Sequence, residues 1–276
     1  MSILDAIILG IVEGLTEFLP ISSTGHLTIA EKLLGKDIDA KSVTAFTAVI
    51  QVGAVVAVLI FFRADIRKLL SAVVHGYRNE ERRRADANWR FTWLIVIGSI
   101  PIGVAGLAAK SLIEGPFRSL WVVAAALILW SGVMVRAERA ARQDRTERQL
   151  RPRDAIVIGL VQCIALIPGV SRSGATISAG LLRGFDRVTA TRLSFFLAIP
   201  ALVAAGLYEL KDAFGQGVGA GPTIVGTVVS FVVAYASIAW LLRFVAHNSI
   251  VKFVPYRVAL GLIVIIVLLA TGASAT

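Results

Sequence analysis

Two glutamates stand four residues apart in a stretch of sequence that is otherwise mostly apolar. Glu13 and Glu17 have the spacing that puts both carboxylates on one face of a helix. Two carboxylates on one face are typical of a divalent-cation site, with Mg²⁺ or Ca²⁺ as the expected ion, or of a site in which one of them handles a proton. A structural alternative leaves one of them in a salt bridge. Both residues are therefore candidate metal ligands.

A run of small polar residues follows the glutamates. The segment 19–25, which we call the first break, contains a proline, two serines, a threonine and a glycine, and His26 follows it. A serine or threonine here is a common N-cap, but capping needs only one hydroxyl and no histidine. Several hydroxyls and the free N–H groups at the start of a helix together favour an anion.

A second break, residues 168–174, repeats this arrangement with a cation. It carries Arg172 between two serines, and a guanidinium suits bidentate binding of phosphate. Arg172 is also a natural counter-ion for Glu17, and the two roles are compatible. The sequence therefore predicts a phosphate-binding site built from both breaks. Its binding residues are expected to be Ser22, Thr24, Gly25, Ser171, Ser173, Gly174 and Thr176.

The catalytic residues expected at this site are Glu17, Ser23, His26 and Arg172. Either Ser23 or His26 attacks phosphorus, or His26 activates a water, and the spacing leaves all three routes open. His26 follows Ser23 by three residues, so the two side chains would share a helical face within reach of each other. Ser23 is the favoured nucleophile, because the dipole at a helix N-terminus stabilises incoming phosphate charge.

The composition places these residues in a membrane. Of the 276 residues, 57% are hydrophobic, whereas soluble domains have about 45–50%; the mean hydropathy is +0.79. The longest apolar blocks have roughly the twenty residues that cross a hydrocarbon core of about 30 Å. A soluble domain is excluded, because it would have to bury several wholly apolar helices. The uncharged blocks are residues 91–109, 119–135, 222–242 and 258–271.

The positive charge lies between the apolar blocks. A net charge of +10 invites a nucleic-acid partner, but the basic residues cluster in the connections, as the positive-inside rule expects, so no nucleic-acid partner is predicted. The single cysteine, Cys163, supports neither a disulfide nor a cysteine-based metal site. No cleavable signal peptide is expected, because the first apolar stretch lacks a basic region and contains two glutamates.

The chain resembles itself at an offset of 149 residues: segments 5–35 and 154–184 share ten identical positions out of 31 without a gap. Each begins with two short apolar arms around a break. This predicts a re-entrant helical hairpin, since irregular backbone at membrane depth must line a cavity or be buried in protein. We therefore predict an all-α polytopic membrane protein with one membrane domain made of two repeats. The first is 1–140, with hairpin 3–35 and spans near 43–62, 91–109 and 119–136; the second is 150–276, with hairpin 152–184 and spans near 189–208, 222–242 and 256–272.

The number of crossings predicts how the two repeats are oriented. A hairpin returns to its own side and three spans then cross, so the second repeat begins on the opposite face, as in an inverted-topology repeat. The connections 63–90, 136–153, 183–192 and 243–257 hold 21 Lys and Arg, and those of the other side hold six. This asymmetry puts both termini outside the cytoplasm. The hairpins then enter from opposite faces, so their tips meet near the midplane at a site open to the outer face.

Two long motifs carry a resemblance to a known family. The stretch EGLTEFLPISSTGH, from Glu13 to His26, resembles the first signature of bacterial undecaprenyl-diphosphate phosphatases, the UppP or BacA family, and PGVSRSGAT, from Pro168 to Thr176, resembles the second. The resemblance covers essentially the whole chain, and neither motif departs from the family pattern. The family's functional residues carry over onto Glu13, Glu17, Ser23, His26, Ser171, Arg172, Ser173 and Thr176.

The resemblance implies a multi-pass enzyme of the bacterial plasma (inner) membrane whose active site faces the periplasmic side. Its implied reaction is the hydrolysis of undecaprenyl diphosphate to the monophosphate with a divalent cation, which recycles the carrier lipid for peptidoglycan synthesis. Bacitracin sequesters the diphosphate lipid, so a link to bacitracin resistance is implied as well. The polyprenyl tail is expected in a groove of lipid-facing apolar side chains, among membrane lipid. The oligomeric state, a homodimer included, stays open.

A transporter or lipid flippase is the main alternative, because inverted repeats with broken helices are typical of transporters. The two repeats differ, however, where chemistry needs it: Glu13 corresponds to Gln162, and Ser23 corresponds to Arg172. A symmetric transporter has less reason for this division into acids and a cation. A non-catalytic scaffold needs no intramembrane Glu, His and Arg. Release of phosphate by the purified protein separates these three functions.

Overall fold

Six apolar helices form most of the structure. The computed structural model describes residues 1–38, 40–81, 86–213 and 219–271, which form twelve α-helices, three short 3₁₀ helices and no strand. Six stretches among them are long and apolar enough to cross a membrane, and they confirm the six predicted spans. They are α3 (Lys41–Phe61), α6 (Ala87–Ala108), α8 (Leu120–Ala140), α11 (Arg187–Ala213), α12 (Ala220–His247) and the stretch Ile250–Thr271, which ends in α13 (Val254–Thr271).

Two pairs of shorter helices flank the two breaks. In the first pair, α1 (Ile3–Thr16) packs against α2 (Ser23–Leu33), and in the second, α9 (Pro152–Ile164) packs against α10 (Arg172–Leu182). With 14 and 11 residues, α1 and α2 are only about 21 and 16 Å long at 1.5 Å per residue. Neither helix is long enough to cross a bilayer alone.

An aspartate in the first turn closes each pair at the end away from its break. Asp5 of α1 pairs with Lys36, just after α2, at 2.7 Å. Asp154, the equivalent residue of α9, pairs with Arg183 after α10 at 2.7 Å and with Arg145 at 2.5 Å. Each aspartate therefore links the start of the first short helix to the end of the second and holds the two helices side by side.

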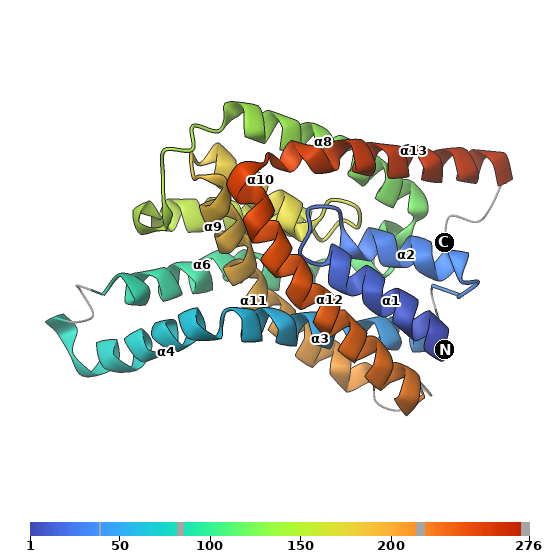
Figure 1. Cartoon of the computed structure of the whole chain (residues 1–276), viewed down its shortest axis with the longest axis horizontal. Helices are drawn as coiled ribbons and strands as arrows, with labels where there is room; N and C mark the ends of the chain where they lie inside the picture. Colours follow the sequence, from blue (N-terminus) through green and yellow to red (C-terminus); the bar gives the residue numbers. More distant parts are fainter. Residues whose placement is uncertain (39, 82–85, 214–218, 272–276) are drawn as a thin grey trace.

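Each short pair docks on a long helix from the other half of the chain. α1 packs along α12, and α9 packs along α6. Glycines make both contacts close: a Cβ on Gly10 would lie 2.6 Å from the carbonyl oxygen of Gly226, and a Cβ on Gly159 would lie 2.2 Å from that of Gly98. Gly10 and Gly159 are 149 residues apart, so the two contacts occupy equivalent places. The halves are also joined by α3 with α11 and by α8 with α13, which run side by side in Figure 1.

One basic connection is largely helical. The predicted connection 63–90 contains α4 (Arg63–Arg78), which follows α3 after the single residue Phe62, and it also contains the start of α6. α4 and the first turns of α6 project from one end of the molecule, opposite the first turn of α1 and the last turn of α13 (Figure 1). A charged helix resembles a loop in a hydropathy pattern, because its polar residues interrupt the apolar blocks. The remaining elements are α7 (Lys110–Glu114) and the 3₁₀ helices Pro116–Arg118, Glu147–Gln149 and Ile250–Phe253.

Candidate active site

The two breaks touch each other. Ser22 Oγ accepts a 3.0 Å hydrogen bond from the N–H of Gly169. The carbonyl oxygen of Leu19 likewise accepts hydrogen bonds from the hydroxyls of Ser173, at 2.9 Å, and Ser171, at 3.4 Å. The second break therefore supplies the donors and the first break the acceptors, and the two breaks lie in direct contact, as the sequence predicts.

Each break positions a serine with an unusual backbone conformation. Ser22 and Ser171, at equivalent positions, have φ angles of 77° and 76°, in the left-handed region that non-glycine residues rarely adopt. Each serine caps the following helix by accepting from the N–H of a glycine, Gly25 at 3.4 Å and Gly174 at 3.1 Å. Such a conformation costs about 1–3 kcal/mol and is found mainly at functional sites. It starts α2 and α10 abruptly, so two helix N-termini lie at the contact between the breaks and favour an anion there.

Glu17 joins the two halves of the site. Its Oε2 accepts a 2.5 Å hydrogen bond from Ser23 Oγ, and its Oε1 accepts a 2.9 Å bond from Arg172 Nη2. Glu17 caps the end of α1, whereas Ser23 and Arg172 are the first residues of α2 and α10. The fold therefore brings three of the predicted catalytic residues into one connected group of a hydroxyl, a carboxylate and a guanidinium.

Half of the Arg172 guanidinium is available to a ligand. Its Nη1 is buried and has no hydrogen-bond partner among the residues that the structure describes. A buried donor without an acceptor costs about 1–3 kcal/mol, so an acceptor is expected at this place. A phosphate oxygen at this place would satisfy Nη1 while Nη2 stayed on Glu17, so the geometry is compatible with both a counter-ion role and a phosphate-binding role.

His26 makes its hydrogen bonds away from Ser23. Its Nδ1 lies 2.7 Å from the carbonyl oxygen of Ser22, and its Nε2 lies 2.7 Å from the hydroxyl of Tyr256, whose ring stacks on the imidazole. A carbonyl oxygen only accepts, so Nδ1 carries a hydrogen, and in the neutral ring Nε2 accepts from the tyrosine. In this geometry the hydroxyl of Ser23 is paired with Glu17 and the imidazole is held by Tyr256.

A buried arginine that no motif indicates holds both breaks. Arg257 is fully buried. Its guanidinium donates to carbonyl oxygens of the first break and of the second, and also to a serine hydroxyl on α8. The acceptors are Pro20 O at 2.9 Å, Gly169 O at 2.8 Å, Val170 O at 3.2 Å and Ser131 Oγ at 3.1 Å. These bonds engage carbonyl groups of the breaks, so Arg257 does not compete for an anion with the N–H groups at the starts of α2 and α10.

The hydropathy pattern places Arg257 in the connection 243–257, as a basic residue that signals topology, and this placement is wrong. The residue lies in the first turn of α13 and is tied to the breaks. Without Arg257, the connections on the predicted cytoplasmic side hold 20 Lys and Arg, and those on the other side hold six. In the sequence, Arg257 stands out only because it follows Tyr256 and directly precedes the uncharged block 258–271.

The other predicted binding residues mainly build the site. The hydroxyls of Ser22, Ser171 and Ser173 are used in the contact between the breaks. Thr176 is buried, and its hydroxyl lies 2.6 Å from that of Ser194 on α11. Thr24 is exposed in the first turn of α2. The groups left for an anion are therefore Arg172 Nη1, the exposed hydroxyl of Thr24 and the N–H groups of the first two residues of α2 and of α10, since the N–H groups of Gly25 and Gly174 donate to the capping serines.

Glu13 and Glu17 do not form a finished cation site. Glu13 is buried in α1 and its charge acts on Arg172, but both oxygens of Glu17 are engaged by Ser23 and Arg172. Among the described residues, no group of three or more His, Cys, Asp or Glu is arranged to hold a metal ion. Mg²⁺ is commonly held by one or two carboxylates together with substrate phosphates. The donor set fits a cation that arrives with a phosphorylated ligand and does not fit a resident one.

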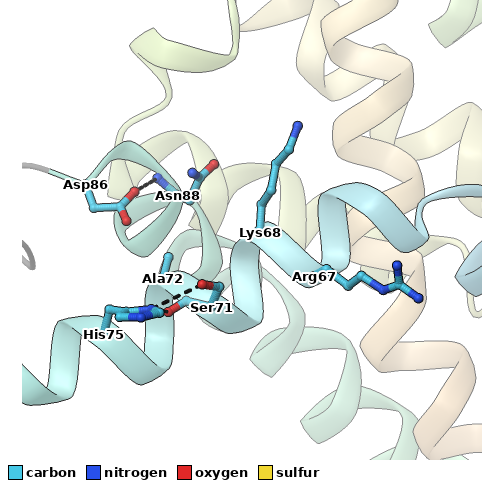
Figure 2. Close-up of a pocket in the computed structure, with 7 residues that line it drawn as sticks. All are labelled: Arg67, Lys68, Ser71, Ala72, His75, Asp86 and Asn88. Carbon is cyan, nitrogen blue, oxygen red and sulfur yellow. Dashed lines mark hydrogen bonds between the residues drawn. The ribbon is translucent and has the colours of Figure 1, made fainter.

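An open surface hollow of about 620 Å³, called the cavity below, lies elsewhere, between α4 and α6 (Figure 2). It belongs to the end of the molecule from which α4 projects, away from the breaks. None of the predicted site residues lines it. The lining residues are Arg67, Lys68, Ser71, Ala72, His75, Asp86 and Asn88.

Comparison with known proteins agrees with the two motifs. The family model described as "Bacitracin resistance protein BacA" matches residues 6–263 of this chain. One similar protein is Undecaprenyl-diphosphatase 3 of Frankia casuarinae, 58% identical over 99% of this chain and 98% of its own length. The Undecaprenyl-diphosphatase of Acidothermus cellulolyticus is 56% identical over 96% of both chains, and that of Cutibacterium acnes is 55% identical over 100% of both. Since these matches run through both breaks and nearly the whole fold, the chain belongs to the bacitracin resistance protein BacA family.

Proposed function

We propose that this chain hydrolyses undecaprenyl diphosphate to undecaprenyl phosphate and inorganic phosphate. The proposal rests on the connected group of Ser23, Glu17 and Arg172, in which a hydroxyl is paired with a carboxylate and a buried guanidinium nitrogen lacks an acceptor among the described residues. The names of the relatives support the substrate. Hydrolysis returns the carrier lipid to the form used for peptidoglycan synthesis and removes the form that bacitracin sequesters.

Ser23 is the nucleophile in this proposal. Its Oγ attacks the terminal phosphorus, and its proton passes to Glu17 along the existing 2.5 Å hydrogen bond while the bond from phosphorus to the bridging oxygen breaks. Undecaprenyl phosphate leaves, and Ser23 keeps the phosphoryl group as an ester. A water then attacks the ester phosphorus, and Ser23 Oγ leaves with the proton that Glu17 holds. The inorganic phosphate keeps the oxygen and hydrogens of that water.

Arg172 stabilises the charge of the transferred phosphoryl group. Nη1 donates to a phosphate oxygen, and the N–H groups at the starts of α2 and α10 donate to the others. A single preorganised donor of this kind typically contributes about 10²–10³ in rate. The role of base falls to Glu17, because Nε2 of His26 is directed at Tyr256.

A divalent cation, Mg²⁺ or Ca²⁺, enters this proposal together with the diphosphate. Glu13 would be its first protein ligand, and Glu17 would be a second only where its hydrogen bonds to Ser23 and Arg172 give way. When bound, the cation neutralises negative charge on the diphosphate. The steps above are carried by the side chains of the protein.

We also propose that the two halves form an inverted-topology repeat in the bacterial plasma membrane, with each short pair as a re-entrant hairpin. The equivalent close contacts of Gly10 with Gly226 and of Gly159 with Gly98 support this arrangement. The charge asymmetry of the connections, 20 Lys and Arg on one side against six on the other, supports it as well. Both termini then lie outside the cytoplasm, the site faces the periplasmic side, and the lipid tail lies among membrane-facing side chains. A homodimer and the lack of a nucleic-acid partner stay predictions. C-terminal reporter fusions test the topology, and a reporter active only in the cytoplasm would contradict it.

The activity is tested by phosphate release from a short-chain polyprenyl diphosphate by the purified protein in detergent. We expect one phosphate per lipid, loss of release in Ser23→Ala, and lower release with a chelator. Ser111→Ala is the matched control, because it removes an exposed serine hydroxyl on α7, outside both breaks. If the protein moves the lipid across vesicles but releases no phosphate, the transporter alternative is right and this proposal is wrong.

A further inference from the structure

Helix α4 has three distinct faces. Ala72 and Gly76 form the buried face, where a Cβ on Gly76 would lie 2.4 Å from the ring of Trp89 on α6. A second face is apolar yet open: Leu70, Val74 and Tyr77 are 59%, 51% and 68% exposed. These three residues follow the i, i+4, i+7 spacing of one helical stripe. Nothing among the described residues covers this stripe.

The exposed stripe continues onto a membrane-spanning surface. Tyr77 contacts Trp89, with ring centroids 5.2 Å apart, and Trp89 contacts Trp93 at 5.7 Å. From Trp93, the open apolar face of α6 runs on through Ile100 and Val104, which are also exposed, and α6 is one of the six candidate spans. Aromatic clusters of this kind are typical of the membrane–water interface. The stripe on α4 is therefore continuous with the surface that faces lipid.

The third face of α4 is basic and borders the cavity. Arg67 and Lys68 extend from α4 beside that cavity, and Ser71 and His75 lie one turn farther along (Figure 2). The one carboxylate in the lining, Asp86, is used as a cap, since it accepts from the N–H of Asn88 at 2.8 Å. The cavity of about 620 Å³ thus offers two cations and several hydrogen-bonding groups next to an apolar stripe.

We propose that α4 lies in the headgroup layer of the bilayer and that this cavity binds the phosphate headgroup of an anionic phospholipid. Apolar residues on one face and lysines or arginines beside them are the pattern of a helix lying in the membrane interface. Each basic residue near an anionic surface contributes about 1 kcal/mol of binding, which is about fivefold in affinity. The acyl chains would lie along Leu70, Val74 and Tyr77, and the phosphate would draw in the side chains of Arg67 and Lys68, which point apart in Figure 2. This surface is independent of the active site.

Native mass spectrometry of the purified protein in a neutral detergent tests the proposal, with phosphatidylglycerol, phosphatidylcholine and inorganic phosphate as separate ligands. Wild type should bind phosphatidylglycerol in preference to phosphatidylcholine, and inorganic phosphate should not displace it. The double variant Arg67→Ala/Lys68→Ala should bind phosphatidylglycerol about 25-fold more weakly, since each basic residue contributes about fivefold. Arg136→Ala/Arg139→Ala, which removes two exposed arginines of α8 outside the cavity, is the charge-matched control and should bind like wild type.

Three outcomes would overturn the proposal. The first is equal binding of the two lipids by wild type, and the second is an equal loss in both double variants. The third is displacement by inorganic phosphate, which would mean a site for soluble anions. The melting temperature of each variant, compared with wild type, identifies a variant that has lost its fold. In that case the single variants Arg67→Gln and Lys68→Gln replace the double one, with an expected loss of about fivefold each.

Discussion

The hydroxyl of Ser23 lies 2.5 Å from one oxygen of Glu17, and the other oxygen of the same carboxylate holds Arg172 at 2.9 Å. One carboxylate therefore serves a hydroxyl on α2 and a cation on α10. Each half of the chain supplies one side of the group, so the proposed chemistry depends on the contact between the two breaks. Misplacing either side by about 1 Å is enough to cost about 10²-fold in rate.

Arg172→Lys is expected to lower kcat/KM by about 10²-fold or more. Lysine keeps the charge and can pair with Glu17, but one ammonium group lacks the fork that holds a carboxylate and a phosphate oxygen at the same time. Steady-state phosphate release measures the loss. Arg183→Lys is the control, since Arg183 pairs with Asp154 away from the breaks. Activity of Arg172→Lys within about twofold of wild type would mean that Arg172 only neutralises Glu17.

Arg257→Met should lower both the melting temperature and kcat. It leaves three backbone carbonyls of the breaks buried without their donor, at about 1–3 kcal/mol for each unsatisfied group. Thermal unfolding and phosphate release per folded protein are the measurements. Ser131→Ala is the matched control, because it removes the fourth acceptor of Arg257 and keeps the three bonds to the breaks. Equal effects of the two changes would speak against a role for Arg257 in positioning the breaks.

The tautomer of His26 can be read by nitrogen NMR. The contacts with Ser22 and Tyr256 predict a hydrogen on Nδ1 in the neutral ring. The chain has only three histidines, so ¹⁵N-histidine labelling gives few signals, and substitution of His75 and His247 identifies the third. Tyr256→Phe should keep the hydrogen on Nδ1, because the carbonyl oxygen of Ser22 still requires a donor, and should change only the Nε2 signal, which loses its partner. A hydrogen on Nε2 in the neutral wild type would refute this assignment.

Gly159→Ala is expected to destabilise the fold by about 1–3 kcal/mol, the usual range for an overpacked core. The added methyl would lie 2.2 Å from the carbonyl oxygen of Gly98, so α9 would have to move away from α6. Gly103→Ala in α6 is the control, since an added Cβ there meets nothing within 4 Å. Thermal unfolding in detergent compares the two. Equal melting temperatures would show that the close approach of α9 and α6 is not needed.

The six apolar helices and the two short pairs were predictable because their signals are local. A block of roughly twenty uncharged residues is long enough to cross the bilayer, and a proline within a run of several small polar residues commonly ends a helix, as at the two breaks. The contact between the two breaks followed from counting the crossings of an internal repeat, whereas the residue pair that makes it, Ser22 and Gly169, did not. Local pattern and repeat counting were therefore sufficient for the elements and for the meeting of the breaks.

The partners inside the site were not predictable in the same way. Arg257 and Tyr256 act on groups that are 237 and 230 positions away in the chain. A charge at the edge of an apolar block ordinarily marks a membrane interface, and only the fold buries this one. Helical spacing paired Ser23 with His26, but Ser23 is the first residue of α2, so its hydroxyl reaches back to the end of α1.

Rapid-quench trapping of the phosphoenzyme tests the central claim most directly. Wild type is mixed with a short-chain polyprenyl diphosphate labelled in the terminal phosphate, stopped within milliseconds in acid or in alkali, and mapped by mass spectrometry. The predicted result is a phosphoserine on Ser23 that survives acid, is lost in alkali, and is absent from Ser23→Ala. A phosphohistidine on His26 that survives alkali and is lost in acid, or rapid turnover with no protein adduct, would contradict the account.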